Sequence, residues 1–118
     1  MSKPNTPNVN FSEGKLRLTG RSVIADSDAF FDPIIDKVIN EMQSSDPIKE
    51  IEISLDYINS STVRSLLKMF IQLEGLNKTG SSINVRWLYQ SEDEIMYEHG
   101  KTFEAIVELP LELIAFSS

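Results

Sequence analysis

The feature that most constrains the fold of this 118-residue chain is a strand-like segment over residues 51–57 followed closely by a helix-like segment over residues 63–76. Apolar residues alternate with polar ones over residues 51–57, which is the period of a half-buried strand. From residue 63 to residue 76 the apolar residues recur at helical spacing. Three consecutive hydroxyl residues, Ser60, Ser61 and Thr62, lie between the two runs. We therefore predict a strand–helix junction of an α/β domain.

Four further strand-like runs surround this unit. Glu13-Gly14 is a turn signal between the first two of them, which predicts an N-terminal hairpin. Residues 1–8 are polar and contain two prolines, so we expect a flexible arm ahead of a domain over residues 9–118. The four runs are residues 9–11, 15–19, 83–89 and 111–115.

Helical spacing of apolar residues also predicts helices on either side of the central unit. Asp26-Ser27-Asp28 is typical of a helix start, but the regular part of this first helix should begin near Asp32, because Pro33 fits only the first turn of a helix. Residues 91–94 form a capping-box pattern, and we expect the helix that follows to end at His99, since Gly100 breaks it. Thr102 then caps a short fourth helix. We predict one domain with a mixed, mostly parallel sheet of about five strands, joined by right-handed crossovers through about four helices.

The hydroxyls at residues 60–62 have two interpretations. The first turn of a helix leaves backbone N–H groups unpaired and carries the positive end of the helix dipole. A hydroxyl there caps the helix, which is the commoner case, and a phosphate there is held by the same donors, which makes a phosphorylation switch. Arg64 and Lys68 follow one and two turns later, where they either approach a phosphate or form a solvated face.

Composition narrows the class of partner. The net charge is −7, and an acidic surface repels nucleic acids and anionic lipids, so we expect protein partners and neither nucleic acid nor membrane. The absence of cysteine excludes disulfides and thiolate metal sites. There is no apolar run of membrane-spanning length, and the N-terminus lacks the apolar region of a secretion signal. We therefore expect a cytoplasmic protein.

Catalytic chemistry has little support in the sequence. Glu92, Asp93, Glu94 and Glu98 suggest a hard metal site, but acids at a helix start need no metal. His99 is the only histidine, and no nucleophile–base pair can be assembled around it. We predict no catalytic residue, no metal and no cofactor, and a small enzyme using these acids is the least favoured alternative.

Five short motifs together are distinctive, and on them the chain resembles the SiaC family of bacterial biofilm-regulation phosphoproteins over about residues 8–116. More distantly, the chain resembles the STAS-type anti-sigma-factor antagonists, which implies a STAS-like fold. The motifs are Tyr57-Ile58-Asn59-Ser60-Ser61 with Leu66-Leu67, then Val85-Arg86-Trp87-Leu88-Tyr89, Glu92-Asp93-Glu94-Ile95-Met96, Gly100-Lys101-Thr102-Phe103 and Leu109-Pro110-Leu111.

The resemblance implies a function that spacing does not give. The phosphoacceptor threonine of the SiaC family matches Ser60, whereas the match to the anti-sigma-factor antagonists favours Ser61. Such proteins are not enzymes but substrates of a dedicated protein kinase and a PP2C-type phosphatase. The unphosphorylated form binds and activates a diguanylate cyclase, which raises cyclic di-GMP. The alternative is an anti-sigma-factor antagonist of the partner-switching type.

We predict that the helix after residue 62 and its N-terminal loop form the partner surface. The loop leads into the helix, and a polar stripe at i, i+4 and i+8 forms the exposed face of that helix. The predicted partner-binding residues are Tyr57, Ile58, Asn59, Thr62, Arg64, Lys68 and Gln72.

Overall fold

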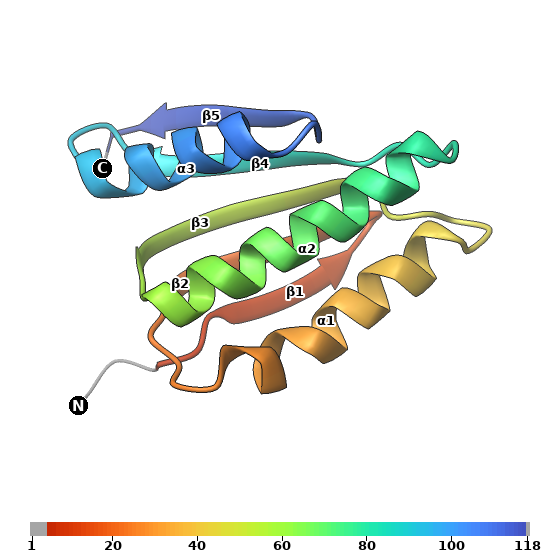
Figure 1. The fold of residues 1–118 in the computed structure, drawn as a ribbon, viewed down its shortest axis with the longest axis horizontal. Helices are drawn as coiled ribbons and strands as arrows, with labels where there is room; N and C mark the ends of the chain where they lie inside the picture. Colours follow the sequence, from red (N-terminus) through yellow and green to blue (C-terminus); the bar gives the residue numbers. More distant parts are fainter. Residues whose placement is uncertain (1–4, 118) are drawn as a thin grey trace.

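The structure is a computed structural model that describes residues 5–117. In that part of the chain, five strands and three helices form one α/β domain (Figure 1). In chain order the elements are β1 (Asn8–Ser12), β2 (Lys15–Ser22), α1 (Ser27–Met42), β3 (Glu50–Ile58), α2 (Ser60–Lys78), β4 (Asn84–Gln90), α3 (Glu94–Ile106) and β5 (Leu111–Phe116).

The five strands lie in the sheet in the order in which they occur in the chain. β1 pairs with β2 antiparallel, and β2 to β5 all run parallel. Each crossover therefore moves one strand in the same direction, and crossovers of one hand place every helix on one face of the sheet. Figure 1 shows α1, α2 and α3 together in front of the strands. The predicted hairpin and mostly parallel sheet are confirmed.

The hairpin turn explains why β1 and β2 meet in register. Glu13 has φ of 53° and Gly14 has φ of 75°, so both central residues adopt the left-handed region that a two-residue hairpin loop needs. Residues 1–4 of the predicted arm lie outside the described residues. The carbonyl of Asn5 accepts a hydrogen bond from the backbone N–H of Val23 at 2.8 Å. The flexibility of the arm stays a prediction.

The expected fourth helix is absent from residues 5–117, because α3 continues through Gly100 as one helix to Ile106. The prediction of about four helices is therefore wrong. A Cβ atom at Gly100 would lie 2.6 Å from a ring carbon of Trp87, so the glycine lets α3 approach β4 closely. The indole N–H of Trp87 also donates to the backbone carbonyl of Met96 at 2.9 Å. This glycine marks close packing rather than a helix end.

The first helix also begins earlier than expected. α1 starts at Ser27, and the Asp26 carboxylate caps it by accepting from the backbone N–H of Ala29 at 3.3 Å. Pro33 lies inside the helix on an exposed position. The regular helix therefore starts at the Asp26-Ser27-Asp28 signal and not near Asp32, where we expected it. Pro33 lacks one backbone donor, and the turn before it is held by the Asp26 cap and by the fully buried Phe31.

A change of register near the end of β3 sets up the junction with α2. Gly20 pairs with Leu55, but Arg21 pairs with Tyr57, so the pairing skips Asp56. After this bulge Ile58 is 4% exposed, and Tyr57 is 51% exposed. The core position that strict alternation assigns to Tyr57 is therefore taken by Ile58.

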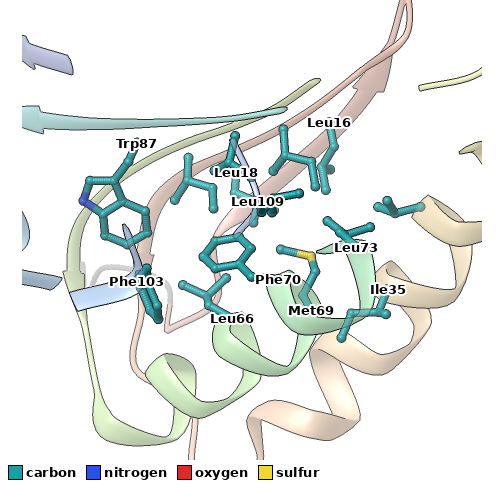
Figure 2. Close-up of a cluster of buried hydrophobic side chains, with 14 of the residues drawn as sticks. Leu16, Leu18, Ile35, Leu66, Met69, Phe70, Leu73, Trp87, Phe103 and Leu109 are labelled. Carbon is teal, nitrogen blue, oxygen red and sulfur yellow. The ribbon is translucent and has the colours of Figure 1, made fainter. Parts of the chain in front are cut away.

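The hydrophobic core holds α2 firmly against the sheet. Figure 2 shows Leu66, Phe70 and Leu73 of α2 together with Leu16 and Leu18 of β2, and all five are fully buried. A fully buried leucine or phenylalanine stabilises the fold by about 1.5–3 kcal/mol relative to an exposed one. The packing of these side chains against the sheet therefore fixes the position of α2, including its first turn.

The other face of the sheet carries paired charges. Glu52 of β3 is 8% exposed and accepts from Arg17 at 2.7 Å and from Arg86 at 3.2 Å. Lys15 lies 2.9 Å from Glu50 and 3.6 Å from Glu52. These ion pairs bind β2, β3 and β4 together, on a face that no helix of residues 5–117 covers.

Candidate functional site

The junction between β3 and α2 is capped by an amide and not by a hydroxyl. α2 begins at Ser60, and the Asn59 side-chain oxygen accepts from the backbone N–H of Thr62 at 3.0 Å and from its hydroxyl at 2.8 Å. The Asn59 amide nitrogen donates to the carbonyl of Ile24 at 3.0 Å. The idea that a hydroxyl caps this helix is therefore wrong, because asparagine satisfies the same donor from the preceding position.

The three hydroxyls have different surroundings. Thr62 is fully buried, with its oxygen 2.6 Å from the hydroxyl of Ser22. Ser61 is half-buried, with its oxygen 2.6 Å from the hydroxyl of Ser27. Ser60 is exposed, and its hydroxyl has no hydrogen-bond partner within residues 5–117. Only Ser60 therefore presents a free hydroxyl at this junction.

A buried group of hydroxyls behind the junction was missed by sequence reasoning. Ser27 at the start of α1 is 3% exposed, and Ser65 on α2 is 1% exposed. Their oxygens lie 2.6 Å apart, and the Ser65 hydroxyl donates to the Asp28 carboxylate at 2.9 Å. The available signal was Ser65 itself, a polar residue between the buried positions of an amphipathic helix.

The N-terminus of α2 also differs in charge from its two neighbours. Asp26 caps α1 and Asp28 lies in its first turn, while Asp93 caps α3 and Glu94 follows it. The first turn of α2 holds no acid and its cap, Asn59, is neutral. The positive end of the α2 dipole is therefore not compensated by a carboxylate of its own helix.

The predicted partner residues fall into two groups. Tyr57, Arg64, Lys68 and Gln72 are exposed, and Ile71, which the sequence analysis missed, is 50% exposed on the same helix.

The other three are used within the fold. Ile58 is 4% exposed and Thr62 is fully buried, while Asn59 is half-buried and occupied by the cap. These three side chains therefore contribute to the fold, and the exposed group supplies the accessible surface of α2 and its loop.

Lys68 is directed away from the junction. Its Nζ lies 2.7 Å from Oδ1 of Asp32 on α1, and both side chains are largely exposed. This hydrogen bond, with the charges of Asp28 and Asp36 adding to it, raises the pKa of Lys68. Arg64 makes no ion pair within residues 5–117, and it follows Ser60 by one helical turn. Arg64 is thus the cation placed to meet a group on Ser60.

No metal-binding group was found in residues 5–117: no three side chains of the histidine, cysteine, aspartate and glutamate types gather in a suitable cluster. Asp93 is occupied by its cap, in which it accepts from the backbone N–H of Met96 at 3.1 Å. Burial lowers the pKa of His99, against an opposing effect of Asp93, so the ring is neutral at pH 7. The helices of residues 5–117 include none long and apolar enough to cross a membrane.

The part of the chain that the structure describes is a small α/β domain in which a free serine hydroxyl lies at the N-terminus of α2, whose first turn holds no acid. The model of the SiaC family of regulatory phosphoproteins matches residues 1–116. The chain belongs to this family.

Similar proteins are found at low sequence identity. An uncharacterised protein of Pseudomonas aeruginosa strain UCBPP-PA14 is 24% identical over 113 residues, which is 94% of this chain and 90% of the relative. A chain in the crystal structure of the diguanylate cyclase SiaD in complex with its activator SiaC, from P. aeruginosa, has a TM-score of 0.84 and 24% identity, with 95% of this chain and 93% of that chain covered.

A crystal structure of apo-SiaC from the same organism has a TM-score of 0.81 and 23% identity, and it covers 98% of this chain and 100% of that chain. These likenesses establish the SiaC-like fold. The wider STAS-like resemblance stays a prediction.

Proposed function

We propose that this protein is a phospho-switched signalling protein and not an enzyme, and that Ser60 carries the switch. A dedicated protein kinase adds the phosphate and a PP2C-type phosphatase removes it. The observation that carries the proposal is the free, exposed Ser60 hydroxyl in the first turn of α2. Membership of a family of regulatory phosphoproteins supports it.

Ser60 is a better acceptor than its neighbours on physical grounds. Phosphorylation of Thr62 requires a fully buried oxygen to leave its contacts with Ser22 and Asn59. Modification of Ser61, our second choice, requires it to leave Ser27. Each hydrogen bond contributes about 0.5–1.5 kcal/mol net, and a buried group left without a partner costs about 1–3 kcal/mol. Ser60 breaks no such contact.

A phosphate on Ser60 fits the local electrostatics. The group carries about −1.5 to −2 charges at pH 7. It lies beside the backbone N–H groups of the first turn, and no acid of that turn repels it. Arg64, one turn further on, is placed to pair with it. The fold itself need not change for the surface to change sign.

We propose that the unphosphorylated form binds and activates a diguanylate cyclase and so raises cyclic di-GMP. The support is the SiaD–SiaC complex, in which a protein of this fold is the activator of such a cyclase. The contact surface is the exposed side of α2 and its loop, with Tyr57, Arg64, Lys68 and Gln72. Kinases use ATP and diguanylate cyclases use GTP, so we place the protein in the cytoplasm.

Phosphorylation at the centre of that surface disfavours the complex. The phosphate dianion on Ser60 must lose bound water when the complex forms. Arg64 pairs with this phosphate and is then not available to pair with the partner. Unfavourable charge placement at an interface costs several kcal/mol, and each 1.4 kcal/mol weakens binding about tenfold. A micromolar complex is then lost at cellular concentrations.

The experiment is phosphosite mapping with a matched variant. We expect incubation with ATP and a lysate of the source bacterium to place phosphate on Ser60, and Ser60→Ala to lose it. In a pull-down from the same lysate, Ser60→Ala should retain a diguanylate cyclase, whereas Ser60→Asp should retain less. Phosphate found only outside residues 60–62 contradicts the proposal. Capture of an anti-sigma factor instead of a cyclase keeps the switch but replaces the output.

A further inference from the structure

Ser27, at the start of α1, contacts Ser61 and Ser65 at the start of α2 from the buried side of the helix. Its hydroxyl oxygen lies 2.7 Å from the Ser61 carbonyl oxygen, 2.6 Å from the Ser61 hydroxyl and 2.6 Å from the Ser65 hydroxyl. The backbone N–H of Ser27 points to the same Ser61 hydroxyl at 3.3 Å. Ser27 itself is 3% exposed, and Ser61 is half-buried, so water has little access to the Ser27 side of these contacts.

The hydrogen bonds of this cluster use both the proton and a lone pair of the Ser61 hydroxyl. The Ser65 proton goes to the Asp28 carboxylate, so the one hydroxyl proton of Ser27 is shared among the Ser61 carbonyl, the Ser61 hydroxyl and the Ser65 hydroxyl. In each arrangement the Ser61 hydroxyl donates to the Ser27 oxygen or to the Ala25 carbonyl at 3.4 Å, while it accepts from the Ser27 N–H. Both the proton and a lone pair of the Ser61 hydroxyl are therefore engaged inside the protein.

Phosphoryl transfer needs both of these to be accessible. The serine oxygen forms a bond to the γ-phosphorus of ATP, the bond from that phosphorus to the bridging oxygen breaks and releases ADP, and the hydroxyl proton passes to a base of the kinase. Ser61 must first rotate away from Ser27, whereas Ser60 is exposed without a partner.

We infer that Ser27 is the positioning residue that directs phosphorylation to Ser60, by holding the hydroxyl of Ser61 inside the protein. This inference rests on the proposed phospho-switch. A buried serine on α1, distant in sequence from the junction, thereby decides which of two adjacent serines is modified. Loss of the Ser27 hydroxyl should change which serine is phosphorylated, and the protein should still be phosphorylated.

The first test measures the ratio of the two phosphosites in Ser27→Ala. The protein is incubated with ATP and a lysate of the source bacterium, and the phosphate on Ser61 relative to Ser60 is quantified by mass spectrometry. Loss of one hydrogen bond predicts a rise of about 2- to 10-fold in this ratio.

Ser22→Ala is the matched control for this ratio. Ser22 is equally buried at the same junction but contacts Thr62 instead of Ser61, so its loss should leave the ratio unchanged. An unchanged ratio in Ser27→Ala, or an equal rise in both variants, overturns the inference.

The second test needs no kinase and begins with the unmodified wild type. Three-bond NMR couplings report the χ1 rotamer of each serine. We expect one rotamer for Ser61 and averaging for Ser60, and averaging at both in Ser27→Ala. An averaged Ser61 in the wild type overturns the inference even if Ser27→Ala does not fold. Phosphate found only outside residues 60–62 instead overturns the proposed switch, and the inference with it.

Discussion

The N-terminus of α2 contrasts with those of α1 and α3, although all three follow parallel strands and lie at the same edge of the sheet. α1 and α3 each have an aspartate cap and another acid in the first turn. α2 has a neutral asparagine and three hydroxyls. The same architecture thus holds two helix starts that are already compensated and one that is open to an added negative charge.

Under the proposed switch, the difference separates a structural use of the helix dipole from a regulatory one. An acid at a helix start stabilises a protein by about 0.3–1 kcal/mol in an exposed setting. At α1 and α3 the sequence supplies that charge permanently. At α2 the proposed kinase would supply it, so the same interaction would become reversible. Substitutions at the starts of α2 and α3 and one binding measurement test this contrast.

The largest effect is expected from removing the buried hydroxyl of Thr62. Thr62→Val keeps the shape of the side chain but leaves Ser22 without its partner, which costs about 1–3 kcal/mol of unfolding free energy. Urea unfolding followed by the fluorescence of the single, buried Trp87 measures it. Ser60→Ala is the control and should stay within about 0.5 kcal/mol. Equal losses of unfolding free energy in both variants would contradict the view that the Thr62 hydroxyl is structural and the Ser60 hydroxyl is not.

A smaller effect is expected from the cap of α2. Asn59→Ala removes the acceptor of the Thr62 N–H and the donor to Ile24, and should cost about 0.5–2 kcal/mol. Asp93→Ala removes the equivalent cap of α3 and should cost a similar amount. Stability curves of the two variants, measured side by side, decide whether the caps are equivalent. A neutral Asn59→Ala would mean that packing alone holds α2.

Ser60→Asp gives α2 the acid that its neighbours already have. We expect it to raise the unfolding free energy by about 0.3–1 kcal/mol at low salt, and the gain should shrink in 1 M salt through screening. Ser60→Asn, of the same size without the charge, is the control. Glu94→Gln on α3 should show the loss of a similar amount. If Ser60→Asp destabilises the protein, the N-terminus of α2 is not open to negative charge.

The smallest effect concerns His99 on α3. Burial lowers its pKa, so its neutral form contributes stability that is present above the unfolded pKa of about 6.5 and is lost as pH falls through the folded pKa. Asp93 opposes this shift, so Asp93→Asn should lower the pKa of His99 further. An NMR titration of the ring protons measures both. A pKa unaffected by Asp93→Asn would remove the electrostatic role assigned to this cap.

Local patterns predicted the elements whose signals are local. The hairpin turn at Glu13-Gly14 and the alternation over residues 51–55 have the expected structure, because turn geometry and strand period depend on near neighbours. Gly100 misled the prediction because its reason is the Trp87 ring beside it in space. The bulge at Asp56 arises from pairing with β2, which alternation does not contain.

The sequence also predicted only part of the candidate site. The segment 59–62 was found from its position between a strand and a helix, and the resemblance to the family pointed to Ser60. The roles of Ser22, Ser27 and Ser65 were not predictable, because their contacts join residues 34 to 40 positions apart in the chain. Ile58 and Thr62 read as surface candidates, and only the three-dimensional packing shows that they are buried.

The affinity of the diguanylate cyclase for protein phosphorylated on Ser60 alone, compared with unmodified protein, tests the central claim most directly. Calorimetric titration of both forms with the cyclase of the same organism gives the two dissociation constants, and Trp87 fluorescence verifies that both are folded. We predict binding at least about 100-fold weaker for the phosphorylated form, equivalent to about 3 kcal/mol. Equal affinities for the two folded forms would contradict the account.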